Sequence, residues 1–100
     1  MTKSIAKSLD SEGTFTDWIS PTSRSGREKF GKLNISISGT WDGTVTLQRS
    51  FDGGTTPLDV EHFVENGEHQ LEDLESVVLY RLGIKDGNYT SGAAAARLSK

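Results

Sequence analysis

The chain has 100 residues, of which 33% are hydrophobic, a formal net charge of −3 and no cysteine. This length allows one domain with a modest core, and the lack of cysteine excludes disulfides and thiol chemistry. No stretch approaches the roughly 18 apolar residues of a membrane helix. The acidic balance argues against a nucleic-acid partner, which usually requires a basic face.

Residues 1–12 are polar, with Ile5 and Leu9 as the large apolar side chains after Met1. The serines among them disfavour a helix. We therefore expect a flexible arm or an edge strand here, followed by a β domain over residues 13–100. The segment lacks the apolar core of a signal peptide, which predicts synthesis in a cytoplasm without an export signal.

Residues 13–20 alternate between apolar and polar, but Phe15 and Trp18 have opposite parity. This predicts a bulge or a strand end between them. The next segment, Pro21–Glu28, has no large apolar side chain and is predicted to be an exposed loop that a partner can order.

Basic and acidic residues are separated along the chain. Residues 59–75 are strongly acidic, whereas four basic residues gather in and after the exposed loop: Arg24, Arg27, Lys29 and Lys32. Separated charge of both signs suits complementary surfaces, so the candidate partner contacts include Arg24, Arg27 and Lys29.

The residues Phe30–Ser38 alternate as a half-buried strand does, with the inward residues Leu33, Ile35 and Ile37. Gly39–Gly43 has glycine at both ends and is predicted to be a turn. Trp41 stands at its tip, where the ring either covers the core or contacts a partner. Trp41 is therefore a fourth candidate contact.

The stretch Gly43–Val60 is predicted to be a β-hairpin that joins two central strands. Val45 and Leu47 alternate with polar residues, and Leu58 and Val60 resume the alternation after a turn.

The turn of this hairpin reads S-x-D-x-G-x-T over residues 50–56. Asp52 can accept backbone hydrogen bonds, and Gly53 and Gly54 tolerate a positive φ. The pattern resembles the Asp-box of sialidases, a structural turn away from the active site, although Pro57 stands where that box usually has Trp. A sialidase propeller needs several blades, so we interpret the motif as a structural turn.

The pair Asn66-Gly67 predicts a two-residue hairpin turn, because both residue types tolerate a positive φ. It would bring His62 and His69 near each other diagonally. A metal site usually requires three or four converging ligands, so no metal site is predicted. Three turn carboxylates are likewise too few for a calcium shell of about six oxygens: Asp42, Asp52 and Asp86.

A central strand is predicted over Val77–Lys85, with the inward residues Val78, Tyr80, Leu82 and Ile84. Asp86-Gly87-Asn88 predicts a hairpin turn into a last strand over Tyr89–Ser99. That strand contains four alanines, whose helix propensity is high, but four residues are too few to form a helix alone. Its predicted inward residues are Ala94, Ala96 and Leu98.

Seven or eight short strands, separated by turn signals and without a long helix, are typical of an all-β antiparallel β-sandwich. The segment ESVVLYRLGIKDGNYTSG resembles the last two strands of an immunoglobulin or fibronectin type III sandwich, without the Cys…Trp…Cys framework of immunoglobulin domains. We therefore expect a single immunoglobulin/fibronectin-like sandwich.

No catalytic constellation occurs in the sequence. It has neither a cysteine nucleophile nor a G-x-S-x-G elbow, and a phosphate-binding glycine loop would need a helix to open. We expect no enzyme, no catalytic residue and no cofactor.

Several motifs over residues 29–100 together resemble small virion proteins of tailed bacteriophages. They are G-T-V-T-L-Q-R-S-F-D-G-G-T-T, a short acidic strand, an N-G-E turn, a Y-R-L-G strand and a final S-G-x-x-x-x-R-L-S strand. The resemblance implies a structural protein that decorates or cements a capsid, is made in the host cytoplasm and resides in the virion. Its partners would be capsid proteins and copies of itself, with a trimer as the expected state.

Two alternatives stay open. One is a tail, collar or fibre-associated virion subunit. The other is a carbohydrate-binding module with a stacking platform of Trp18, Trp41 and Tyr89.

Overall fold

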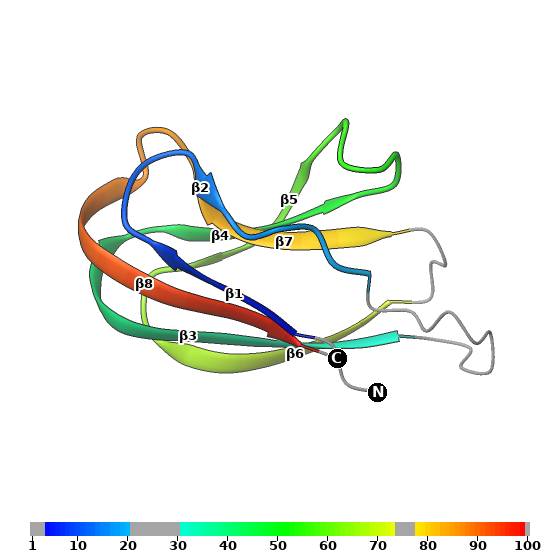
Figure 1. Ribbon diagram of the computed structural model, residues 1–100, viewed down its shortest axis with the longest axis horizontal. Coiled ribbons are helices and arrows are strands. Elements are labelled where there is room, and N and C mark those ends of the chain that lie inside the picture. Colours follow the sequence, from blue (N-terminus) through cyan, green and yellow to red (C-terminus); the bar gives the residue numbers. More distant parts are fainter. Residues whose placement is uncertain (1–3, 21–30, 74–77, 100) are drawn as a thin grey trace.

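The computed structural model describes residues 4–20, 31–73 and 78–99. This part of the chain contains eight strands and no helix, in two four-stranded antiparallel sheets that face each other (Figure 1). Sheet A has the order β1 (Ser4–Leu9), β8 (Tyr89–Ser99), β3 (Gly31–Gly43) and β6 (Gly67–Asp73). Sheet B has the order β2 (Thr14–Phe15), β7 (Leu79–Ile84), β4 (Val45–Ser50) and β5 (Leu58–Phe63). The expected all-β, antiparallel architecture is confirmed.

The strand pairing is nested around the connection between β4 and β5. β4 pairs with β5, β3 with β6, β2 with β7 and β1 with β8. Two further ladders, β3 with β8 and β4 with β7, join these pairs into the two sheets. This order of eight strands in two sheets is that of a jelly roll. The chain is in effect one long hairpin whose two arms are wrapped across both sheets.

Two predicted hairpins are wrong, because the strands on either side of each turn lie in different sheets. The Asn66-Gly67 pair leads from β5 in sheet B to β6 in sheet A, and Gly67 lacks the positive φ that a two-residue hairpin turn requires. Asp86–Asn88 does form a turn, in which the Asn88 N–H donates to the Lys85 carbonyl at 3.0 Å. It connects β7 with β8, which are also in different sheets. The hairpin on which the immunoglobulin-like expectation rested does not form.

The turn predicted over residues 39–43 is also wrong, because these residues continue β3 and pair with β8. Gly39 bends the strand without reversing it. Its φ is 98°, and a Cβ there would lie 2.7 Å from the Ala93 carbonyl oxygen on β8. A residue other than glycine would therefore be strained and would push β8 away. The chain crosses to sheet B at Thr44.

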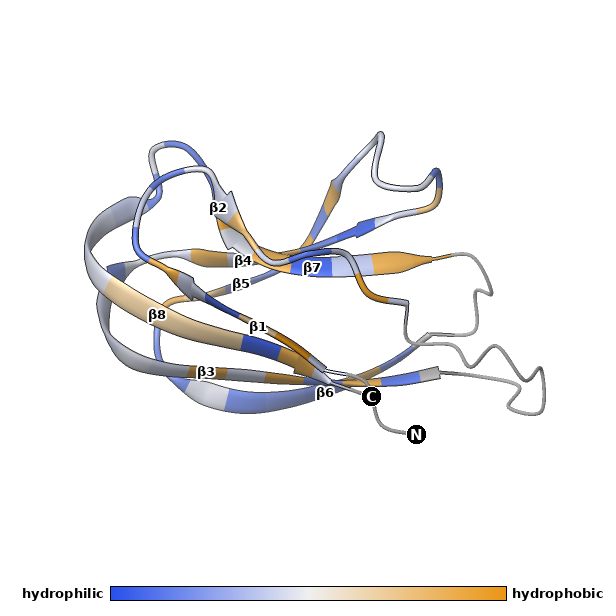
Figure 2. Cartoon of the chain, viewed as in Figure 1, coloured by the Kyte–Doolittle hydropathy of each residue, from blue (hydrophilic) through white to orange (hydrophobic). Residues whose placement is uncertain are grey.

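The core lies between the sheets and is built by alternating residues of the four inner strands. Burying one Leu or Ile side chain stabilises the fold by about 1.5–3 kcal/mol. Figure 2 shows hydrophobic residues along β3, β7 and β8, whereas β6 is largely hydrophilic. The predicted inward faces of these strands and the central position of β7 are confirmed. The following core residues are each at most 3% exposed: Leu33, Ile35, Ile37, Val45, Leu47, Tyr80, Leu82, Ile84, Ala94, Ala96 and Leu98.

The last strand forms although it contains four consecutive alanines. β8 pairs with β1 on one side and with β3 on the other, so both ladders satisfy its backbone groups. Ala94 and Ala96 point into the core as predicted. Helix propensity amounts to less than about 1 kcal/mol per residue, which two ladders and the burial of alternate side chains outweigh.

The N-terminal segment forms β1, an edge strand of sheet A, which is one of the two expected alternatives. Leu9 of this strand is fully buried. β2 then ends after Phe15, and pairing with β7 returns only as a bridge between Ile19 and Tyr80. The predicted interruption between Phe15 and Trp18 is therefore confirmed.

The β4–β5 hairpin forms as predicted, but β5 is an edge strand and not a central one. The register shifts between Leu47 and Gln48, where Val60 is left out of the pairing as a bulge. Figure 1 shows the turn end of this hairpin rising away from sheet A. Leu58 and Val60 continue the apolar pattern of the sequence, but they lie outside the core.

Candidate functional site

β5 exposes apolar side chains at the edge of sheet B. Leu58 is 45% exposed, Val60 41%, and Val64, just after the strand, 72%. Among the described residues β5 pairs with β4 alone, so backbone groups along its other side are open to pairing. Apolar side chains beside an open strand edge form a template for association with another chain.

Phe51 extends this apolar surface to the turn that precedes β5. Phe51 is 42% exposed, and the guanidinium carbon of Arg49 lies 5.1 Å from its ring centroid, within the range of a cation–π contact. We name these exposed apolar residues the β5 edge patch: Phe51, Leu58, Val60 and Val64.

A hydrogen-bonded turn links β4 to β5 and holds the start of the patch. Ser50 Oγ donates to Asp52 Oδ1 at 2.6 Å and accepts from the Gly54 N–H at 2.9 Å. Asp52 Oδ1 also accepts from the Thr56 N–H at 2.8 Å. These hydrogen bonds, the one from Ser50 above all, lower the pKa of Asp52 to about 2. Gly53 and Gly54 adopt positive φ values of 76° and 100°, so the motif acts as a structural turn.

On the outer face of sheet B, Arg81 packs against two aromatic rings. Its guanidinium carbon lies 4.0 Å from the ring centroid of Phe15 and 4.5 Å from that of Trp18. Phe15 lies against Gly83, where its ring occupies the space of a Cβ, and Trp18 lies against Gly54 in the same way. The two glycines therefore make room for the rings that cover Arg81.

A chain of polar contacts orients the same guanidinium. Arg81 Nε donates to Gln48 Oε1 at 2.9 Å, and Gln48 Nε2 donates to Asp59 Oδ1 at 2.9 Å. Asp59 Oδ2 pairs with Lys85 Nζ at 2.6 Å, and His62 Nε2 lies 3.9 Å from that oxygen. The hydrogen bond from Lys85, ahead of that from Gln48, holds the pKa of Asp59 below its usual value. We name the following residues the Arg81 cluster: Phe15, Trp18, Gln48, Asp59 and Arg81.

The sequence reasoning did not identify the Arg81 cluster. The alternation in β7 does place Arg81 on the outer face, because its neighbours in the strand face inward. It does not show that Phe15 and Trp18, far away in the sequence, fold over that face. Gly83 is the one local signal, since glycine inside a central strand often marks the close approach of another group.

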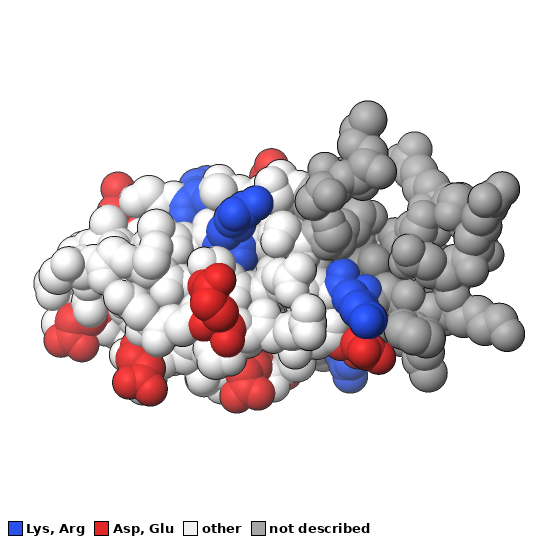
Figure 3. All heavy atoms as spheres, turned by 90° about the horizontal axis from the view of Figure 1, so that it is seen from below, with Lys and Arg blue, Asp and Glu red and all other residues white. Residues whose placement is uncertain are grey.

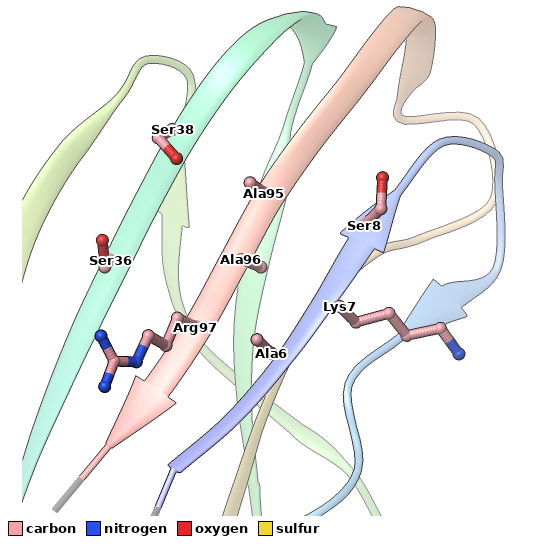
Figure 4. A pocket seen from close by; sticks show the side chains of 8 residues that line it. All are labelled: Ala6, Lys7, Ser8, Ser36, Ser38, Ala95, Ala96 and Arg97. Carbon is pink, nitrogen blue, oxygen red and sulfur yellow. The ribbon is translucent and has the colours of Figure 1, made fainter.

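The outer face of sheet A carries small side chains. A shallow depression of about 440 Å³ lies there between β1, β8 and β3 (Figure 4). Figure 3, which looks onto the molecule from below, shows uncharged atoms over much of this side, with several acidic side chains toward one margin and a few basic and acidic side chains elsewhere on it. Such a surface permits the close approach of a flat partner. The residues that line the depression are Ala6, Lys7, Ser8, Ser36, Ser38, Ala95, Ala96 and Arg97.

Three of the predicted partner contacts lie outside the described residues: Arg24, Arg27 and Lys29. The fourth, Trp41, is half-buried in β3 and packs against the core. Its Nε1 donates to Asn66 Oδ1 at 2.7 Å, and Asn66 Nδ2 donates to the Gly39 carbonyl at 2.9 Å. Trp41 therefore covers the core, which is one of the two roles considered for it.

The aromatic residues considered for glycan stacking do not form one platform. Trp18 lies on the outer face of sheet B beside Arg81, whereas Trp41 and Tyr89 pack against the core. The Tyr89 hydroxyl donates to the Gly92 carbonyl at 3.0 Å.

The two histidines have separate surroundings. His62 lies beside Asp59, and His69 stacks against Phe63 with ring centroids 4.5 Å apart. In the part of the chain that the structure describes, no three His, Asp or Glu side chains gather where a metal ion could bind. Within the same residues, no helix has the length and apolar character to cross a membrane.

Comparisons with known proteins add no relative. No protein family, no curated protein and no solved structure matches the chain.

Proposed function

We propose that the chain is a structural virion protein that decorates and stabilises a bacteriophage capsid through protein–protein contacts. The β5 edge patch is the observation that carries this proposal. It combines exposed apolar side chains with a strand edge that no described strand pairs with, and both favour association with another chain.

The proposed mechanism is mechanical. A strand of a second chain that pairs with β5 adds main-chain hydrogen bonds to sheet B and covers Leu58 and Val60. Burial of apolar surface stabilises such a contact by about 25 cal/mol per Å². In a shell many of these contacts act together, so that modest single contacts add up through multivalency. We propose that the assembling unit is a homo-oligomer, with a trimer as its state.

Two further observations support a virion protein. The motifs over residues 29–100 resemble those of small virion proteins of tailed bacteriophages. The nested strand order is that of a jelly roll, an architecture that viral capsid domains use and that lectin domains and cupins share. We propose the jelly roll as the architecture in place of an immunoglobulin-like sandwich. A fold does not fix a function, so the surface of β5 carries more of the argument than the strand order.

A tail, collar or fibre-associated subunit is the alternative location in the virion, because the same edge would serve there. A carbohydrate-binding role is disfavoured, because Trp18, Trp41 and Tyr89 lie in two different places on the molecule.

The test uses virions from the source of this sequence. Particles purified on a density gradient should contain the chain in a fixed ratio to the major capsid protein, as measured by quantitative mass spectrometry. Antibodies against the chain should label the head in electron micrographs, whereas labelling of the tail would favour the alternative location. Particles stripped of the chain should lose resistance to heating and regain it when the purified chain is added back. Absence of the chain from particles, or unchanged particle stability after stripping, contradicts the proposal.

A further inference from the structure

Arg81 is a half-buried cation with no partner anion among residues 4–20, 31–73 and 78–99. Its Nε donates to Gln48, and its guanidinium packs against two rings. Among the described residues, no carboxylate forms an ion pair with Arg81, and its two terminal amino groups have no hydrogen-bond acceptor. Burial lowers the pKa of Arg81 from its usual value. Partly desolvated charges in proteins are normally paired, so the missing anion needs an explanation.

The cluster holds the guanidinium in one orientation. Gln48 is 6% exposed, and its amide is fixed because Nε2 donates to Asp59 while Oε1 accepts from Arg81. Asp59 is in turn anchored by Lys85 at 2.6 Å. An arginine held in this way loses little further rotamer freedom when it binds a ligand. The terminal amino groups therefore present a preorganised fork.

The charges around Arg81 determine which sign of charge a ligand of this site should carry. Asp59 and Lys85 form an ion pair and cancel each other, which leaves the single positive charge of Arg81. The rings of Phe15 and Trp18 beside the guanidinium lower the local dielectric constant, which strengthens a charge-assisted hydrogen bond. Such a site favours a ligand with one negative charge.

We propose that Arg81, flanked by Phe15 and Trp18, is a binding site for a carboxylate of a partner protein, either an acidic side chain or a C-terminus. A carboxylate is planar and offers two oxygens, which match two parallel N–H donors of a guanidinium. The site lies on the outer face of sheet B, where β4 separates β7 from β5. It does not depend on a virion role, because any protein partner supplies the same group.

The experiment measures anion binding to the full-length chain by nuclear magnetic resonance. The ¹⁵N-labelled protein is titrated with sodium acetate, with sodium phosphate and with sodium chloride, at constant ionic strength. The side-chain N–H signals of Arg81 and Trp18 report on the site. Acetate should shift both signals along a saturating curve with a dissociation constant of roughly 1–100 mM, as expected for a single small-ligand ion pair. Chloride should not shift either signal along a saturating curve.

Two variants separate the fork from the charge. Arg81→Lys keeps the positive charge but loses the planar donors, and it should bind acetate at least about tenfold more weakly. Arg97→Lys makes the same change on the outer face of sheet A and should leave acetate binding unchanged. If Arg81→Lys fails to fold, the acetate titration of the wild-type protein still tests the proposal. The Arg81 signal should then shift along a saturating curve, and the Arg97 signal of the same protein is the internal control.

Three outcomes would overturn the proposal. Acetate shifts that do not saturate, or that are equal at Arg81 and Arg97, would show that no site exists. Equal acetate affinity of Arg81→Lys and the wild type would show that the fork is not used. Saturation by phosphate without saturation by acetate would reject the carboxylate as the ligand. None of these results bears on the presence of the chain in virions, so this proposal and the proposed function fail independently.

Discussion

At the scale of single residues, the outer face of sheet B differs from an ordinary solvated sheet face because the polar side chains of β4 on that face are buried. Thr46 and Ser50 are fully buried, and Gln48 is nearly so. The ring of Phe15 lies against Gly83, which pairs with Thr46. Ser50 and Gln48 use their polar atoms in hydrogen bonds. The Thr46 hydroxyl has no hydrogen-bond partner in the described part of the chain.

Replacing this hydroxyl should therefore stabilise the protein. Thr46→Val should raise the free energy of unfolding by about 1 kcal/mol, because an unpaired buried hydroxyl costs about 1–3 kcal/mol in protein mutational data. Ser50→Ala is the matched control, since it removes a buried hydroxyl that is paired, and it should lower the free energy of unfolding by about 1–2 kcal/mol. Urea denaturation of both variants measures the difference. A loss of stability in Thr46→Val similar to that in Ser50→Ala would contradict the prediction.

At the scale of elements, the turn between β4 and β5 is held by the charge of one carboxylate. The folded-state pKa of Asp52 is about 2, below its ordinary value of 3.8. A carboxylate with a depressed pKa stabilises the folded state fully above the unfolded pKa, and this contribution is lost as the pH falls through the folded pKa. The relevant window is therefore from about pH 4 down to about pH 2.

Asp52→Asn should flatten the pH dependence of stability in that window. The amide keeps an oxygen that accepts from Ser50 and Thr56 but does not titrate. The free energy of unfolding of the wild type, measured by denaturant titration from pH 6 to pH 2, should therefore fall more steeply below pH 4 than that of the variant. Asp42→Asn, in an exposed position on β3, is the control for the removal of one surface carboxylate. Parallel curves for the wild type and Asp52→Asn would show that the turn does not depend on this charge.

The elements also show what a sequence can predict here. A period of two fixes which side chains face inward, and Ile35, Leu82 and Ala96 all face the core as that period predicts. The period does not say which strands pair. Asn66-Gly67 is a strong hairpin signal, yet the Asn66 side chain is used to bind β3 and the chain crosses between the sheets.

A glycine in the sequence is also ambiguous, because it can indicate either a turn or a bend within a strand. Gly39 looks like the start of a turn, but it bends a strand whose partner approaches too closely for a side chain. The Arg81 cluster depends on contacts between residues that are distant in sequence. Gly83 indicates that some group packs closely against β7, but no local pattern around Arg81 identifies that group as Phe15 or adds Trp18 to it.

At the scale of the whole molecule, the open edge of β5 is the surface through which we propose that copies of the chain associate. Val60 is 41% exposed and lies at a bulge in the middle of this edge. A lysine on an edge strand opposes pairing with another strand because its charge must stay solvated. The position is therefore suited to a test of assembly.

Val60→Lys should convert the proposed homo-oligomer into the 10.9 kDa monomer. Light scattering coupled to size-exclusion chromatography measures the mass directly. Thr40→Lys adds the same charge at an exposed position of β3 and should leave the oligomer intact. A wild-type protein that is monomeric at every concentration would refute self-association, and equal masses for the two variants would place the contact elsewhere.

The nested pairing of strands also determines how the chain loses its conformational freedom. β4 and β5 are the one pair of consecutive strands that share a ladder in the described structure, and every other pair encloses them. The entropy cost of closing a loop grows with its length. Once β4 and β5 are joined, the ends of β3 and β6 are already close, and the same holds in turn for β2 with β7 and for β1 with β8. Closure from the innermost pair outward thus replaces one large loop by a series of short ones, and Ser50 and Asp52 stand at the point where that series begins.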